Sequence, residues 1–311
     1  MGLTWVDVRG RRANLTEVLP RPGVPGRDVR EAVAGIVDRV RTGGDEALRT
    51  LTAELDGVVI DGLRVDGDEV QAALERIPGD LRQALEAAKR NIAAYHAHEP
   101  DPPSEWHPEG PARGLTVRHL VRPVERAGCY APGGRARYPS TVLMCAVPAK
   151  VAGVEQVALC VPPGADGRVD DATLAAAALA EVDEVYRVGG AQAIAAMAYG
   201  TKSIRPVDVV VGPGNQFVAE AKRQVAGAVG VASAFAGPSE VVVVAAPETP
   251  ARFAAVDVVV QAEHGPDGTA WLVTWDEAKA HEVEEEIVRL VAASARRADL
   301  EPTLAKGGYV C

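Results

Sequence analysis

The sequence predicts an α/β protein built on parallel β-sheets, with a helical region near its N-terminus. Three observations carry this prediction. The first hundred residues place apolar positions at helical spacing, and the remainder alternates short Val-rich runs with Ala-rich segments. The chain is 47% hydrophobic but only 4% aromatic. Short buried strands separated by helices of small residues are typical of βαβ units on a parallel sheet.

The helical region is predicted by four segments in which apolar residues recur every three or four positions. In 28–41, five valine and isoleucine residues form one stripe, which ends at Gly43 and Gly44. The other three helices are expected at 45–55, 67–76 and 80–97. Two short strands are expected to follow, at 115–121 and 124–130.

From residue 151 onward the pattern predicts alternating strands and helices. The strands are expected at 157–161, 184–188, 207–211, 240–245 and 270–274. The helices are expected at 171–181, 191–199, 215–225, 250–264 and 276–296. The last residues, GGYVC (307–311), have the composition of a further buried strand that is just beginning. We therefore expect this sequence to be a portion of a longer protein.

Charge and composition exclude several classes of partner. The 33 basic and 43 acidic residues give a net charge of −10 at pH 7, which argues against nucleic acid or an anionic membrane surface as the main partner. No apolar run approaches the roughly 20 residues of a membrane span, and the first residues lack the pattern of a secretory signal. The four cysteines show no CxxC spacing. We expect a cytoplasmic protein with reduced thiols.

Glycine-rich polar loops lie at the ends of the predicted strands. They are GGAQ (189–192), GPGN (212–215) and GPSE (237–240). Ligands of open parallel sheets bind beyond the carboxyl ends of the strands, where glycines allow close approach and helix N-termini offer N–H groups to phosphates. Ordinary turn chemistry explains any single loop equally well. Three together predict a nucleotide or another phosphate-bearing ligand, although no GxGxxG motif is present.

The predicted helix 250–264 carries a candidate metal site near its end. Gln261 and His264 are three residues apart and project from one helix face, with Asp257 one turn earlier. An imidazole nitrogen and an amide oxygen can both bind Zn²⁺, although glutamine is an unusual ligand. A solvated helix end is the alternative. Two ligands do not complete a tetrahedral site, so further ligands would come from elsewhere in the chain or from a partner.

A series of motifs resembles the histidinol dehydrogenase family, in order and in approximate spacing. The motifs are GCYAPGG (128–134), YPSTVLM (138–144), VPAKVAG (147–153), GGAQAIAAMAYGT (189–201), GPGNQFVAEAK (212–222), AGPSE (236–240) and QAEH (261–264). The resemblance covers essentially all 311 residues. Several matches of about ten residues are far more specific than a lone glycine pattern.

The resemblance implies an enzyme that oxidises L-histidinol through the aldehyde to L-histidine, with two NAD⁺ and a bound zinc ion. It implies NAD contacts at Tyr130, Gln192 and Asn215. It implies a substrate contact at Ser239, and zinc and substrate contacts at Gln261 and His264. The family's catalytic Glu-His pair and its remaining zinc ligands, an Asp and a His, are expected beyond Cys311. The catalytic residues therefore stay unassigned, and we expect these 311 residues to be inactive alone.

The resemblance also implies a fold of two incomplete Rossmann-like domains in a homodimer with exchanged terminal segments. The expected division is an N-terminal arm at 1–24, a first domain formed by 25–128 and 238–311, and an inserted second domain at 129–237.

The sequence departs from the family pattern at three places: 231–235 lacks the usual Asp-containing segment, Cys145 replaces an Asn, and Gly265 replaces an Asp. These departures leave two alternatives open. One is a related NAD-dependent dehydrogenase of another small alcohol. The other is a truncated paralogue that binds nucleotide or partner chains without catalysis.

Overall fold

The structure, a computed structural model, describes residues 2–10, 26–98, 104–110, 113–133, 137–232, 239–263, 265 and 268–311. Contacts divide the chain into two compact units. One unit is Arg27–Phe235, and the other combines Met1–Gly26 with Ala236–Cys311. Each unit contains a sheet whose strand pairs are all parallel. This confirms the predicted α/β class.

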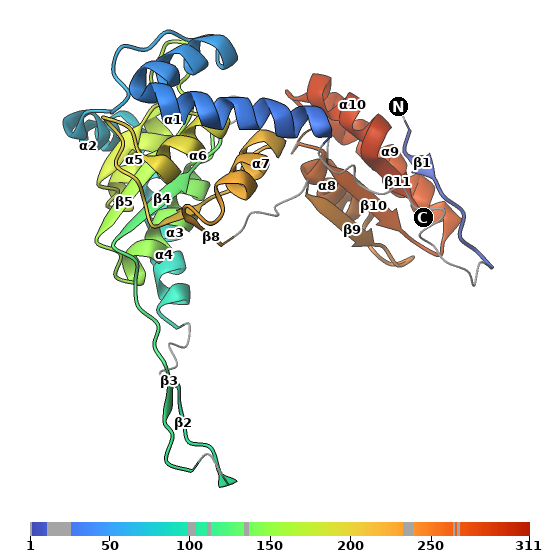
Figure 1. The fold of residues 1–311 in the computed structure, drawn as a ribbon. Coiled ribbons are helices and arrows are strands. Elements are labelled where there is room, and N and C mark those ends of the chain that lie inside the picture. The colour runs from blue at the N-terminus through green and yellow to red at the C-terminus, as the bar shows by residue number, and fades with distance from the viewer. Residues whose placement is uncertain are drawn as a thin grey trace. The chain divides into compact units, whose positions relative to one another are not determined.

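The larger unit is built on a five-stranded sheet, drawn in green to orange in Figure 1. Its strands are β4 (Arg126–Tyr130), β5 (Gln156–Cys160), β6 (Glu184–Tyr186), β7 (Val209–Val211) and β8 (Gly230–Val231). They lie in the order β6-β5-β4-β7-β8. The chain therefore adds strands on one side of β4 and then continues on the other side. The chain thus reverses direction across the sheet between the neighbouring strands β4 and β7. This is a topological switch point, where open α/β sheets bind their ligands.

Helices cover both faces of this sheet (Figure 1). They are α1 (Arg27–Leu55), α2 (Gly67–Arg76), α3 (Gly79–His96), α4 (Pro139–Val151), α5 (Asp171–Leu179), α6 (Gly190–Tyr199) and α7 (Gln216–Val225). Helices α1, α6 and α7 contact one another and share one buried cluster with the sheet, whereas α2 to α5 share a second cluster. Because both faces are covered, the strands consist of near-continuous apolar runs.

Two features of these helices differ from the sequence prediction. The segments 28–41 and 45–55 form the single helix α1, which kinks at Gly44, where φ is 55°. Helix α4 was not predicted because it is apolar almost all round and therefore shows no amphipathic stripe. Its proline at the first helical position, Pro139, suits a helix start.

A two-stranded antiparallel hairpin precedes β4 in the chain. It pairs β2 (Ser104–Trp106) with β3 (Val117–His119), so the strand predicted at 115–121 is shorter than expected. Glu105 lies opposite Arg118 in the register and forms an ion pair with it at 2.9 Å.

The smaller unit has a four-stranded sheet in the order β1-β11-β10-β9. Its strands are β1 (Thr4–Trp5), β9 (Glu240–Val244), β10 (Thr269–Val273) and β11 (Gly308–Val310). Its helices are α8 (Ala251–Ala262), α9 (Glu277–Ala293) and α10 (Arg297–Gly307). The helices and the sheet share one core. Strand β11 confirms the strand expected at the end of the sequence. Helix α10 was not predicted; it carries Pro302 and shows little amphipathic pattern.

Contacts place the helices near the N-terminus with the five-stranded sheet, while the expected domain division joined 25–128 to 238–311. In the structure α1 contacts α6 and α7, α2 contacts α5, and α3 contacts α4. All of these partners belong to the larger unit. An amphipathic pattern shows which face of a helix is buried but not which sheet covers it. Of the expected arm 1–24, residues 1 and 11–24 lie outside the described residues, and β1 pairs with β11.

Candidate functional site

The carboxyl edge of the five-stranded sheet carries the three residues expected to contact NAD. Tyr130 ends β4, Gln192 lies in the first turn of α6 after β6, and Asn215 precedes α7 after β7. In the sheet register Cys129 pairs with Val211, so the loops after β4 and β7 leave neighbouring strands. The structure therefore brings these residues to the switch-point edge of a single unit.

Tyr130 is held at this edge by the main chain. Its hydroxyl oxygen accepts a hydrogen bond from the Gly190 N–H at 3.0 Å, at the start of α6. Gly190 has a φ of 63°, a conformation that favours glycine. The phenol is buried, and this burial raises its pKa to about 12. It therefore stays protonated at neutral pH, with a hydroxyl proton available for donation.

Gln192 is fully buried, and its amide is only half satisfied. Its Nε2 donates to the Asp56 Oδ2 at 3.5 Å, and its Oε1 meets no hydrogen-bond partner among the described residues. Partial enclosure of the Asp56 carboxylate raises its pKa. A buried amide oxygen without a donor is costly, so this atom is a candidate contact for a bound molecule.

The loop GPGN (212–215) is pressed against the backbone of Tyr130. Gly212 has a φ of 111°, and a Cβ at this position would lie 2.0 Å from the Tyr130 carbonyl oxygen. The buried ammonium of Lys222, from α7, donates back to the Gly212 carbonyl. Burial lowers the pKa of Lys222. The close contact and the lysine together fix the loop at the end of β7.

Asn215 is the N-cap of α7. Its Oδ1 accepts hydrogen bonds from the N–H groups of Phe217 and Val218, at 3.0 and 3.1 Å. This explains the Asn before the helix in the sequence, since asparagine is among the best N-cap residues. The cap uses the side-chain oxygen, so the amide NH₂ of this exposed residue remains a donor for a ligand.

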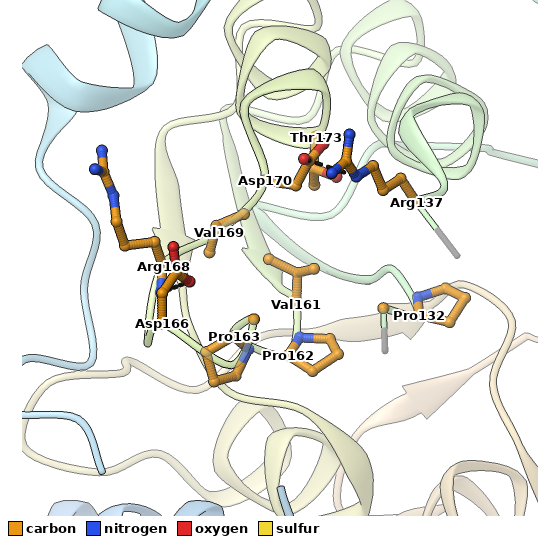
Figure 2. Close-up of a pocket in the computed structure, with 12 residues that line it drawn as sticks. Pro132, Arg137, Val161, Pro162, Pro163, Asp166, Arg168, Val169, Asp170 and Thr173 are labelled. Carbon is orange, nitrogen blue, oxygen red and sulfur yellow. Dashed lines mark hydrogen bonds and ion pairs between the residues drawn. The ribbon is translucent and has the colours of Figure 1, made fainter. Parts of the chain in front are cut away.

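A pocket of about 360 Å³ lies beside this edge, between the ends of β4 and β5 (Figure 2). Its lining residues are Pro132, Gly133, Arg137, Val161, Pro162, Pro163, Gly164, Asp166, Arg168, Val169, Asp170 and Thr173. Pro162 also abuts the start of α6, because a Cβ at Gly189 would lie 2.6 Å from it. The volume falls within the roughly 300–1,000 Å³ of small-molecule sites.

The walls of this pocket combine apolar and charged groups. Figure 2 shows prolines along one wall and the Arg137–Asp170 ion pair, of 2.9 Å, on another. Apart from Pro132 and Gly133 of the motif GCYAPGG, these residues were not singled out in the sequence. The run VPPG (161–164) directly after a buried strand is the signal that points to them, because it follows the same strand-end rule as the three glycine-rich loops.

In the smaller unit the structure brings Ser239 and Gln261 together. The Gln261 Nε2, near the end of α8, donates to the Ser239 carbonyl oxygen at 2.6 Å, just before β9. This bond fixes the amide orientation and leaves the Gln261 Oε1 as the atom available to a metal ion. The glutamine is buried, with 9% of its surface exposed. Its geometry therefore fits the role of an oxygen ligand for zinc.

The expected second ligand, His264, lies outside the described residues. Within the described ranges, no three His, Cys, Asp or Glu side chains gather closely enough to hold a metal ion. Gly265, one of the departures expected from the resemblance, adopts a φ of 116°. This left-handed conformation favours glycine, which gives the departure at this position a backbone reason.

Comparisons with known proteins decide the family. The model of the histidinol dehydrogenase family matches residues 19–311. The chain is 42% identical over 310 residues to histidinol dehydrogenase of Methanothermobacter thermautotrophicus. This match covers 100% of the chain and 71% of that relative. The chain belongs to the histidinol dehydrogenase family. A histidinol dehydrogenase of Synechococcus sp. is 48% identical over 282 residues, with 90% of the chain and 64% of the relative covered.

A solved histidinol dehydrogenase supports the same family at the level of structure. The enzyme from Elizabethkingia anophelis superposes with a TM-score of 0.89 at 31% identity, over 99% of this chain and 70% of that one. The chain thus spans about two thirds of the length of these histidinol dehydrogenases. None of the helices within the described ranges is both long and apolar enough to cross a bilayer.

Proposed function

We propose that this chain forms the NAD-binding part, and a portion of the zinc and substrate site, of a histidinol dehydrogenase. The reaction removes hydride from the alcohol carbon of L-histidinol and again from the hydrated aldehyde, reducing two NAD⁺ and yielding L-histidine. The observation that carries this proposal is the family motif series, read together with a switch-point edge at which Tyr130, Gln192 and Asn215 converge.

The proposed cofactor contacts have the hydrogen-bonding groups that a dinucleotide requires. Tyr130 offers a protonated hydroxyl, Gln192 an unpaired amide oxygen, and Asn215 an amide NH₂ beside the N-terminus of α7. NAD supplies the hydride acceptor when bound. The chain's own contribution is to hold the dinucleotide and to limit its motion, so that hydride transfer occurs in a defined geometry.

The proposed substrate contacts lie around the Gln261 amide. Its hydrogen bond to the Ser239 carbonyl presents Oε1 as a ligand atom, and His264 is the proposed second ligand. When bound, zinc supplies a Lewis acid that holds and orients the imidazole and amine of the substrate. A base must also accept the hydroxyl proton and activate water for the aldehyde step. The family resemblance assigns this work to a Glu-His pair outside these 311 residues.

Two further features are proposals. We propose a homodimer, as the family resemblance implies, and a cytoplasmic location. Cys129, Cys145, Cys160 and Cys311 are all free thiols in the structure, which suits a reducing compartment.

Ligand binding to the purified chain tests the proposed function without presupposing catalysis. Titration calorimetry should detect NADH binding, together with weak L-histidinol binding that requires zinc and is readily abolished by EDTA, because Gln261 and His264 supply only part of the zinc site. A panel of other small alcohols under the same conditions separates a histidinol enzyme from a dehydrogenase of another substrate. Binding of NADH with no zinc-dependent histidinol binding would instead favour the non-catalytic paralogue.

A further inference from the structure

Asp56 is a carboxylate that reaches the cofactor edge from outside the sheet. It follows the last residue of α1, far from the strand-end motifs in sequence, and the residue is exposed. Its Oδ2 faces the buried Gln192 amide at 3.5 Å. This bond is at the long limit for a hydrogen bond, so the carboxylate remains free to accept a stronger one.

The carboxylate determines which way the Gln192 amide faces. A carboxylate accepts but does not donate, so the NH₂ side of the amide must turn toward Asp56. The amide oxygen then lies over Gly190, where an added Cβ would be only 2.5 Å from it. This oxygen has no donor among the described residues. Asp56 therefore orients an acceptor toward the residue that also anchors Tyr130.

The three side chains gather around Gly190. The Gly190 N–H donates to the Tyr130 hydroxyl oxygen, and the Gln192 Nε2 donates to Asp56, while the Gln192 Oε1 lies close to Gly190 without a hydrogen bond to it. In the described part of the chain, the hydroxyl proton of Tyr130 meets no acceptor. The set thus offers two acceptors, on Asp56 and Gln192, and one donor, on Tyr130.

A ribose diol matches this set. Its two hydroxyl groups can donate to a carboxylate and an amide oxygen, and one of its oxygens can accept from a phenol. Dinucleotide-binding folds use an acidic residue for the ribose hydroxyls in the same chemical role. We propose that Asp56 binds a ribose diol of the dinucleotide and positions Gln192 for the same ligand. This inference rests on the proposed NAD binding.

Isosteric substitution of Asp56 tests the proposal. Calorimetric titration of the 311-residue chain with NADH is compared for wild type, Asp56→Asn and Asp61→Asn. The control removes the same charge from an exposed carboxylate five residues further along. We expect Asp56→Asn to weaken NADH binding by about tenfold, the scale of a hydrogen bond to a charged group. Asp61→Asn should leave it unchanged. Matching thermal unfolding curves exclude misfolding.

Two further ligands identify which ribose is bound. If ADP binding to Asp56→Asn weakens in parallel with NADH, Asp56 contacts the adenosine ribose, and the variant should also lose discrimination against NADPH. If ADP binding is unchanged while NADH weakens, Asp56 contacts the nicotinamide ribose.

The outcomes that contradict the proposal are distinct. Asp56→Asn binding NADH as tightly as wild type, or Asp61→Asn weakening it equally, overturns the role of Asp56 and leaves the proposed function standing. A wild-type chain that binds no NADH overturns both.

Discussion

At the scale of single residues, a largely buried ion pair of the larger unit joins Arg126 to Glu184, at the amino ends of β4 and β6. The buried Arg126 donates to Glu184 and, at 3.0 Å, to Gln156, while the Tyr186 hydroxyl donates to Glu184 at 2.9 Å. Burial alone would raise the pKa of Glu184, but the hydrogen bonds from Arg126 and Tyr186 outweigh it and lower the pKa. Glu184 is therefore ionised at neutral pH.

This pair should make stability depend on pH in the acid range. A lowered carboxyl pKa contributes stability above the unfolded value of about 4.3, and this contribution is lost as pH falls through the folded pKa. We expect Glu184→Gln to cost about 2–4 kcal/mol at pH 7, because it leaves a buried guanidinium uncompensated. The difference from wild type should shrink below about pH 4. Urea unfolding across pH measures both.

Glu181→Gln is the matched control for this experiment. Glu181 pairs with Lys89 at the surface, with 72% of its side chain exposed. Its loss should cost less than about 1 kcal/mol. Equal effects of the two substitutions would show that burial of the Glu184 pair is not what stabilises the fold.

Asn215 combines two roles that one substitution can separate. Asn215→Asp keeps an oxygen that caps α7 but removes the amide NH₂ proposed to contact NAD. We expect unfolding free energy to change by less than about 0.5 kcal/mol, since Asp and Asn are equivalent caps. NADH affinity should fall by about tenfold. Asn215→Ala, which lacks the cap, should also lose about 1 kcal/mol of stability. If Asn215→Asp binds NADH normally, the amide is not a cofactor contact.

Sequence patterns identified the residues proposed to contact NAD only where a motif marked them. Asn215 and Gln192 follow glycines at strand ends and could be singled out. Asp56 could not, because its proximity to Gln192 depends on the packing of α1 against α6, which no local pattern reports. For the prolines of the pocket, the sequence showed that they follow strands but not that they line one cavity.

At the scale of elements, the loop after β7 contains a glycine, Gly212, at which any side chain would be strained. Gly212→Ala would place a Cβ against the Tyr130 carbonyl, in addition to the strain of a positive φ. We expect a loss of roughly 2–4 kcal/mol of stability. Gly227→Ala is the control, because its φ of 102° carries the same strain with open space around the added carbon. It should cost only about 1 kcal/mol.

Urea unfolding of both glycine variants gives the comparison. A Gly212→Ala protein as stable as Gly227→Ala would mean that the loop can move away from Tyr130 without loss.

Most elements were predictable because each buries either one face or both faces, and either case leaves a regular pattern of apolar residues in the sequence. The strands appear as Val-rich runs, and the helices near the N-terminus as amphipathic stripes. Helix α4 escaped because an almost wholly apolar helix has no polar face. The continuity of α1 through Gly44 was not predicted, because two adjacent glycines in the sequence indicate the end of a helix. The packing that keeps both halves helical is not visible in the sequence.

At the scale of the whole molecule, the proposed cofactor residues and the proposed zinc residues belong to different units. Tyr130, Gln192 and Asn215 lie in the larger unit, and Ser239 and Gln261 lie in the smaller one. We therefore expect EDTA to abolish L-histidinol binding and to leave NADH affinity unchanged. Gln261→Ala should reproduce this pattern, with calorimetry as the measurement. Loss of NADH binding on metal removal would contradict the separation.

The sequence predicted the class of the fold and the family. The domain division inferred from the resemblance stays a prediction, because the grouping of helices depends on contacts such as α1 on α6 and α7, between segments far apart along the chain. The local sequence of each helix shows only which of its faces is apolar. The sheet against which that face packs is determined by the fold of the whole chain.

The anchor of the Tyr130 phenol is a main-chain N–H rather than a side chain. Mutagenesis of neighbouring positions cannot delete such a donor, since every residue except proline carries it. The aromatic ring would thus hold its orientation while side chains around it are exchanged. Side chains around Tyr130 could therefore be redesigned to accept a modified dinucleotide while the position of the Tyr130 ring is kept.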